Sequence, residues 1–203
     1  VSLNDICLDN CRNSLFERLI HIENINNREE YTGVLRRQGR MHPDIAEFPN
    51  KMFYYKENLQ PVPLEHQTKK QLEYSLESID YLDDALKAHR MVFIPSRFCK
   101  EPNISDKVNS EEAKIVTDIL RRIYRFYGVK FNADKTVGVI VPYRNQISMI
   151  KKEIEKLGIP ELEDISIDTV ERYQGSQRDV IIYSFTIQNR YQLDFLTSNC
   201  FEE

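Results

Sequence analysis

The apolar positions of this 203-residue chain form short continuous runs that predict buried strands. Residues 136–141 and 180–185 are rich in Val and Ile, as strands buried on both faces are, and residues 165–170 alternate apolar with polar side chains. A fourth run, residues 91–95, also predicts a buried strand. A polar turn around Gly175 separates the strand at 165–170 from the strand at 180–185.

Between these runs, apolar residues recur at spacings of three and four, which predicts helices. Ser14 and Glu17 form a capping box that opens one packing helix, and Ser110 caps a longer helix that Gly128 ends. A further helix follows the polar turn after residue 141, with Ile147, Ile150, Ile154 and Leu157 on one face and Gly158 at its end. Strands that alternate with amphipathic helices predict an α/β fold in three layers with a mainly parallel sheet.

The polar stretch at residues 57–90 predicts a helical insertion or connector, in which Thr68 caps a helix. The apolar stripe of that helix comprises Leu72, Leu76, Ile79, Leu82 and Leu86. The length favours one domain, or one domain with a small insertion. The expected segments are residues 1–56, residues 57–90 and residues 91–203.

Arg40 lies directly ahead of another predicted helix, which has Pro43 at its first position. Ile45 and Phe48 are expected to face the core before Pro49 restarts the chain in a second short helical turn. An arginine beside a helix N-terminus stands where phosphates bind readily, so Arg40 is a candidate phosphate ligand.

Composition narrows the classes of function. The net charge of -4 implies no attraction of the whole molecule to nucleic acid, so local clusters such as Arg36–Arg37 and Arg121–Arg122 would have to provide it. The four cysteines have no histidine at ligand spacing, which predicts no metal site and a reduced protein of the cytoplasm, or of the nucleus in a eukaryote. No apolar run is long enough to span a bilayer, and a chain that begins with Val is expected to be a piece of a longer protein.

Residues 165–185 closely resemble motif V of superfamily 1 helicases, whose usual form is D-T-V-D-x-F-Q-G-x-E-x-D-V-I-I. Gln177 departs from it, because the family usually has Glu there. The alternative is an ordinary polar hairpin or crossover loop. The resemblance implies ATP contacts by Gly175, Gln177 and Arg178, and nucleic-acid contacts by Thr169, Val170, Tyr173 and Gln174.

The residues around Arg40, Gln38-Gly39-Arg40-Met41-His42-Pro43, are similar to the family motif Q-Y-R-M-H-P. By that resemblance Gln38 and Arg40 bind ATP, and Arg40 is the catalytic arginine that reaches the γ-phosphate. A guanidinium suits this role because its forked donors match the charge that develops in the transition state. Gly39 replaces the usual aromatic residue, which removes a stacking partner for adenine.

The segment Val141-Pro142-Tyr143-Arg144-Asn145-Gln146 resembles the family's T-P-Y-R-x-Q, which contacts the backbone of single-stranded nucleic acid. Tyr143 can offer a ring face to a base and Arg144 a charge to a phosphate. Pro142 and Gln146 complete the implied contact set. Val141 stands where the family usually has Thr. The alternative is a strand-to-helix turn with capping side chains.

Together the three motifs imply the second RecA-like domain of an ATP-dependent helicase, with a P-loop NTPase fold. The implied partners are single-stranded nucleic acid, with DNA slightly favoured over RNA, and the first RecA-like domain of the same parent chain. That absent domain would hold most of the ATP and Mg²⁺. Because the chain has no Walker A, Walker B or motif VI sequence, it is expected to be inactive alone.

Two other classes of function stay open at this stage. The domain could be a degenerate helicase relative that binds nucleic acid or protein, which Gly39 and Gln177 favour. It could also be an unrelated doubly wound hydrolase or nuclease, although the sequence has no nucleophile elbow and no clustered carboxylates.

Overall fold

The computed structural model describes residues 14–69, 74, 76–96 and 105–197. They belong to two compact units, Val1–Lys70 and Gln71–Glu203. The boundary falls inside the predicted insertion at 57–90. Residues 57–69 lie with the first unit because a strand there pairs with a strand of that unit, and residues 76–90 lie with the second.

The first unit contains short elements around one pair of strands. In chain order these are α1 (Leu15–Ile25), η2 (Glu29–Tyr31), β1 (Arg37–Gln38), α2 (Pro43–Met52), β2 (Gln60–Pro61) and α3 (Glu65–Thr68). Strands β1 and β2 pair in parallel, with Arg37 opposite Gln60 and Gln38 opposite Pro61. The stretch after Arg40 is therefore bracketed by two paired strands.

Helix α1 confirms the predicted capping box. The Ser14 N–H donates to Glu17 Oε2 at 2.8 Å, and the Glu17 N–H donates to Ser14 Oγ at 3.1 Å. The predicted packing face does not pack, because Leu15, Phe16 and Leu19 are 67%, 71% and 50% exposed. The capping box fixes where the helix starts without burying its apolar side.

Helix α2 begins at Pro43 as predicted and is capped by His42, whose Nδ1 accepts from the Asp44 N–H at 3.2 Å. The predicted restart at Pro49 is wrong, because the helix continues through Pro49 to Met52. The predicted inward face is also wrong. Ile45 and Phe48 are exposed and Ala46 is the buried residue of this helix, so the helix is rotated relative to the expectation.

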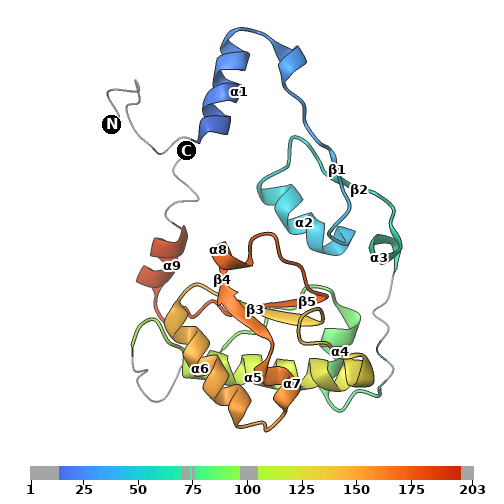
Figure 1. The fold of residues 1–203 in the computed structure, drawn as a ribbon, viewed down its shortest axis with the longest axis vertical. Helices are drawn as coiled ribbons and strands as arrows, with labels where there is room; N and C mark the ends of the chain where they lie inside the picture. Colours follow the sequence, from blue (N-terminus) through green and yellow to red (C-terminus); the bar gives the residue numbers. More distant parts are fainter. Residues whose placement is uncertain (1–13, 70–73, 75, 97–104, 198–203) are drawn as a thin grey trace. The chain divides into compact units, whose positions relative to one another are not determined.

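The second unit contains a parallel sheet and the longer helices (Figure 1). In chain order its elements are α4 (Tyr81–Ala88), α5 (Ser110–Tyr127), η3 (Gly128–Lys130), β3 (Val137–Val141), α6 (Arg144–Glu155), α7 (Pro160–Glu163), β4 (Ser166–Thr169), α8 (Val170–Tyr173), β5 (Val180–Tyr183) and α9 (Arg190–Thr197). The strand order is β4-β3-β5, and both pairings are parallel. The prediction of an α/β fold with a mainly parallel sheet is confirmed.

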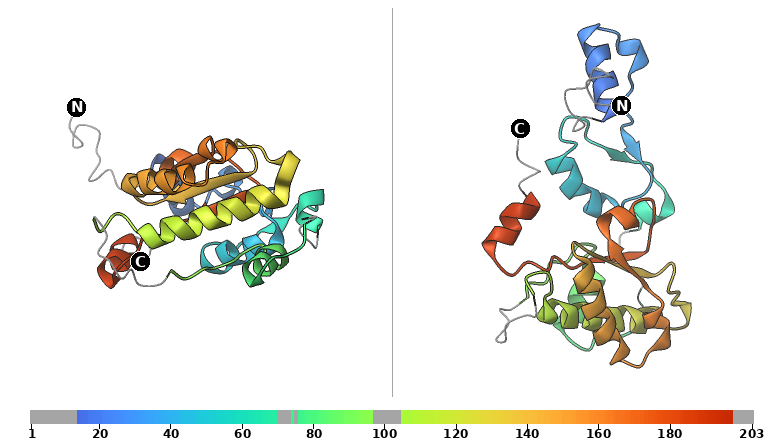
Figure 2. Two further views of the ribbon diagram at one scale, coloured as in Figure 1. Left: turned by 90° about the horizontal axis from the view of Figure 1, so that it is seen from below. Right: turned by 60° about the vertical axis from the view of Figure 1, so that its left-hand side comes forward.

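The core of this unit lies between the sheet and helices α5 and α6, which run side by side in both views of Figure 2. Its fully buried side chains include Val139 of β3, Leu120 of α5 and Ile150 of α6. Strand β3 is central, with Ile140 opposite both Asp168 of β4 and Tyr183 of β5. The carboxyl ends of all three strands therefore meet at one edge of the sheet.

Three further sequence predictions are wrong. Thr68 is the last residue of α3 rather than a cap. Among the described residues the next helix is α4, capped by Asp80, and Leu72 lies outside them. Residues 91–95 form no strand, and Phe93 is 77% exposed. The cap of α5 is Asn109, one residue before the predicted Ser110, because the Asn109 carboxamide oxygen accepts from the Glu112 N–H.

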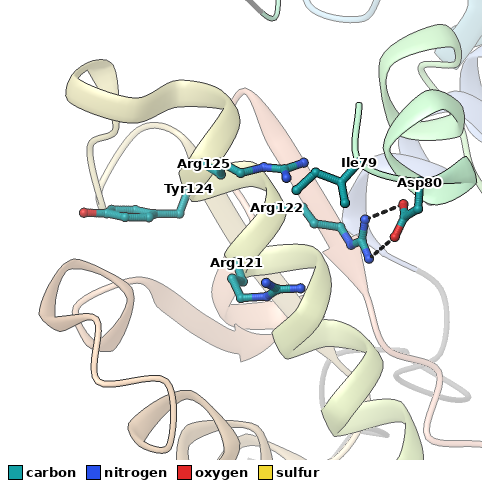
Figure 3. A pocket seen from close by; sticks show the side chains of 6 residues that line it. All are labelled: Ile79, Asp80, Arg121, Arg122, Tyr124 and Arg125. Atoms are coloured by element: carbon teal, nitrogen blue, oxygen red, sulfur yellow. Dashed lines mark hydrogen bonds and ion pairs between the residues drawn. The ribbon is translucent and has the colours of Figure 1, made fainter. Parts of the chain in front are cut away.

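An ionic network joins α4 to α5, and Figure 3 shows its Arg122–Asp80 pair. Arg122 donates to Asp80 at 2.7 and 2.9 Å, to Asp83 at 2.6 Å and to Asp118 at 2.8 Å. Arg125 also pairs with Asp83, whose side chain is fully buried. A cavity of about 290 Å³ beside this network is lined by Ile79, Asp80, Arg121, Arg122, Tyr124 and Arg125. Arg122 and Arg125 of α5 thus hold α4, whereas Arg121 pairs with Asp118 of its own helix.

The ionic network should make the stability of the chain fall in acid. The Arg122 guanidinium lowers the pKa of Asp80 from 3.8 to about 2, and burial of Asp83 is outweighed by donors from Ile79 and the two arginines, so its pKa is lowered too. A pKa that is lower in the folded state stabilises the fold above the unfolded value and loses that effect as pH falls through the folded value. We expect the free energy of unfolding in urea, followed by circular dichroism, to drop between about pH 4 and pH 2. In Arg122→Gln the drop should be shallower, and equal slopes would contradict the prediction.

Candidate functional site

The loop that carries Arg40 in the first unit is built around the side chain of Gln38. Gln38 Oε1 accepts from the N–H groups of Arg40 at 3.0 Å and Met41 at 2.7 Å, and Gln38 Nε2 donates to the Met41 carbonyl at 2.7 Å. Both polar ends of this carboxamide are therefore used within the loop. Gln38 therefore positions Arg40, and its own contact with ATP stays a prediction.

A second set of contacts fixes the same loop from α3. The buried Gln67 donates from Nε2 to the carbonyls of Gln38 and Met41, both at 2.9 Å, and His66 Nε2 lies 3.0 Å from the Gly39 carbonyl. No pattern in the sequence indicates these two residues, because the contacts join segments far apart in the chain. They leave the loop backbone with few unsatisfied groups.

Arg40 itself is exposed at the end of this fixed loop. Within residues 14–69 no carboxylate forms an ion pair with it. Directly after it, His42 caps α2, a helix of ten residues with Asp44 in its first turn. The hydrogen-bonded loop thus places the Arg40 guanidinium with its charge available to an anion.

The loop after β4 in the second unit packs onto the sheet through Tyr173. This side chain is only 7% exposed and lies over Gly138 of β3, where a Cβ atom would stand 1.6 Å from Tyr173 Oη. The Arg178 guanidinium lies 5.8 Å from the centre of the Tyr173 ring and donates to the Gln177 carbonyl at 2.8 Å. The prediction that Tyr173 offers a ring face to nucleic acid conflicts with this packing, because the ring already fills the space above Gly138.

Gly138→Ala should displace Tyr173 and the loop that carries it from the sheet. The added methyl group would stand 2.6 Å from Tyr173 Cζ as well as against Oη, so the buried ring has to leave its place. Overpacking of this kind costs about 1–3 kcal/mol. We expect a lower midpoint in urea unfolding, and Gly138→Ala combined with Tyr173→Ala should recover part of the loss. A single variant as stable as the wild type would show that Tyr173 is not packed there.

The rest of this loop is accessible. Gly175 has φ of +86°, a left-handed conformation that favours glycine, and it is exposed together with Gln174 and Gln177. A short helix, α8, which the sequence did not predict, precedes this tip. The loop also crosses between β4 and β5 on opposite sides of β3, so it is a crossover and not a hairpin.

The carboxyl edge of the sheet brings together several of the residues predicted to bind nucleic acid. Thr169 ends β4 opposite Val141 of β3, from which Pro142 and Tyr143 lead to the exposed Arg144. Val170 is 49% exposed. Glu171 lies beside Thr169 and Arg144. Its own N–H, the Thr169 hydroxyl and the charge of Arg144 lower the pKa of its carboxyl group. Glu171 was not predicted, since nothing in the motif distinguishes it from a solvated residue.

Gln146 does not reach the surface. Its side chain is fully buried, accepts from the Asn109 N–H at 2.9 Å and donates to the Asn109 carbonyl at 3.0 Å. Ser184 Oγ lies 3.4 Å from its Nε2. Gln146 therefore has a role inside the fold, which sequence spacing alone could not reveal, and this placement gives no support to its predicted contact with nucleic acid.

The described part of the chain holds no cluster of three or more His, Cys, Asp or Glu side chains arranged to bind a metal ion. None of the helices in that part combines the length and apolar character that a membrane span requires.

Comparison with known proteins gives one family and several relatives. A family model described as an AAA domain matches residues 11–199. The chain is 30% identical over 188 residues to an uncharacterized ATP-dependent helicase of Methanocaldococcus jannaschii, covering 86% of this chain and 24% of that protein. It is 29% identical to a regulator of nonsense transcripts 1 homolog of Neurospora crassa (88% of this chain, 15% of that protein) and 27% identical to helicase sen1 of Schizosaccharomyces pombe (72% and 8%). The chain thus spans about a quarter or less of the length of these curated relatives.

Proposed function

Because the chain belongs to the AAA domain family and is related to proteins named as helicases, we propose that it is the second RecA-like domain of an ATP-dependent nucleic-acid helicase. In this role it supplies an arginine finger and part of the track for a single strand. Hydrolysis of ATP would then drive translocation and unwinding inside the cell, in the cytoplasm or in a eukaryotic nucleus.

The observation that carries this proposal is the presentation of Arg40. Its loop is held by Gln38, His66 and Gln67, while its own side chain is exposed. A pre-positioned guanidinium stabilises charge in a transition state without reorganising when the reaction occurs. This arrangement supports contact between Arg40 and the γ-phosphate, with Gln38 as the residue that places it.

ATP bound with Mg²⁺ supplies the free energy for movement, and most of its ligands are proposed to come from a first RecA-like domain. The residues of this chain are proposed to supply the smaller part of the ATP contacts. Arg40, Gly175 and Gln177 are exposed and able to meet phosphate or ribose, whereas Arg178 is partly buried against Tyr173. The chain alone is therefore expected to have no ATPase activity.

For the single strand we propose the carboxyl edge of the β4-β3-β5 sheet. Arg144 offers a charge to a phosphate, Tyr143 a ring to a base, and Pro142, Thr169, Val170 and Gln174 line the same edge or the loop beside it. These groups recognise phosphate, sugar and ring faces, so they serve for DNA and RNA alike. We retain DNA as the slightly favoured strand.

Arg144→Ala in the parent protein should weaken binding of a single-stranded oligonucleotide and reduce its dependence on salt. Loss of one phosphate contact lowers the slope of log K against log salt by about 0.7. Fluorescence anisotropy at several salt concentrations would measure both values. Lys151→Ala, an exposed residue of the same helix, is the control and should leave the slope unchanged. An unchanged slope in Arg144→Ala would show that Arg144 does not contact a phosphate of the single strand.

The degenerate binding module stays as the second candidate, because Gly39 and Gln177 replace an aromatic residue and an acid of the family motifs. ATPase assays of the parent protein with and without single-stranded DNA or RNA separate the two. Turnover that either strand stimulates supports the motor. Strand binding with no turnover would support the module.

A further inference from the structure

A buried polar cluster at the start of α5 is not used in the proposed function. The Glu112 carboxylate accepts at Oε2 from Ser184 Oγ at 2.6 Å and from the Thr186 N–H at 2.7 Å. Ser184 and Thr186 follow β5 and are buried, with 2% and 0% exposure. One carboxylate therefore fixes the turn that leaves the sheet.

The turn is strained at Thr186. Its φ is +59°, a left-handed conformation that a β-branched residue rarely adopts. Its hydroxyl is also buried without a hydrogen-bond partner among the described residues. Such conformations persist only where the surroundings impose them, and here the Glu112 contact does so.

The same cluster contacts the segment proposed to bind a single strand. Gln146, in the first turn of α6 after Tyr143 and Arg144, pairs with both backbone groups of Asn109 and approaches Ser184. On the other side, Gln188 donates to the carbonyls of Ser105 and Val108. Buried hydrogen bonds thus connect α6, the start of α5 and the chain beyond β5.

We propose that Glu112 and Thr186 form a strained latch that positions the Tyr143–Arg144 segment and couples strand binding there to the chain after β5. The latch has two arrangements: Thr186 held left-handed by Glu112, or Thr186 released to an extended conformation with the contact broken. A single-stranded nucleic acid that binds one arrangement more tightly changes the populations of the two arrangements, and with them the conformation of the chain after β5. This inference rests on the proposed function.

Thr186→Gly and Thr186→Ala form a matched pair that tests the strain. Both remove the hydroxyl and methyl groups and keep the N–H that Glu112 accepts, but only glycine removes the cost of the left-handed conformation. We expect Thr186→Gly to melt a few degrees above Thr186→Ala. In the parent protein, stimulation of ATPase by a single strand should be about fivefold weaker in the glycine variant than in the alanine variant. Equal stimulation in the two variants would show that the strain is only structural, and equal melting would show that Thr186 is not strained.

Glu112→Gln in the 203-residue chain supplies a test without ATPase. The variant weakens the contact and retains the size of the side chain, and Glu111→Gln is the control at the neighbouring position. We expect faster amide hydrogen exchange over residues 184–188 and also over residues 142–149. Faster exchange confined to 184–188 would overturn the positioning role. A parent protein that no single strand stimulates would count against the proposed function, and the exchange measurement would still decide whether the latch exists.

Discussion

Arg40→Ala in the parent protein should lower ATP turnover by about a thousandfold, the effect typical of a lost arginine finger. The exposed guanidinium stands on a loop fixed by Gln38 and Gln67, so its removal takes away a pre-placed charge without disturbing the fold. Binding of a single-stranded oligonucleotide should stay nearly unchanged, because the proposed track lies on other residues. Steady-state turnover and fluorescence anisotropy measure the two properties.

Two further variants make the Arg40 result specific. Arg40→Lys keeps the charge but not the forked geometry, so it should recover only a small part of the turnover. Arg36→Ala removes a nearby exposed arginine and should have little effect. Full ATP turnover in Arg40→Ala would show that Arg40 is not an arginine finger, whatever the result for binding of the single strand.

Asp83→Ala should cost about 3 kcal/mol of folding stability, because it removes the buried carboxylate that pairs with Arg122 and Arg125, while Arg122 keeps only Asp80 and Asp118. The Asp83 side chain is fully buried and pairs with both Arg122 and Arg125, while its Oδ2 also accepts from the Ile79 N–H at 2.8 Å. The loss would loosen α4 from α5. Urea unfolding followed by circular dichroism is the suitable measurement, since the chain has no tryptophan.

The neighbouring Asp84 provides the control, since it is exposed on the same helix. Asp84→Ala should change the free energy of unfolding by less than about 0.5 kcal/mol. If both variants lost the same stability, the network would be contributing nothing beyond helix propensity and surface charge.

The sequence predicted best the elements whose signal is local. The apolar run at 136–141 predicted β3, and Gly128 predicted the end of α5, where its φ is +50°. The Ser14 capping box likewise depends on two residues three positions apart. Such patterns depend on residues close together in the chain, so they can be recognised without knowing the tertiary fold.

Predictions that depended on distant contacts were weaker. Gln146 matched a binding motif, yet its partners are Asn109 and Ser184, which only the folded chain brings near. Gln67, in a stretch without any motif, holds the Arg40 loop from a distant segment. Motif spacing indicated which segments matter, but it could not separate residues that touch a ligand from residues that place them.

The central position of β3 has a consequence for how the chain folds. Both of its partners, β4 and β5, follow it in the sequence, so during synthesis β3 emerges before either edge can be paired. Parallel pairing across intervening helices is slow to form, and an unpaired apolar strand can associate with other chains. Any shortened version that ends before Val180 would leave one edge of β3 open permanently. Such truncations should aggregate, and soluble expression should require the complete β5 strand.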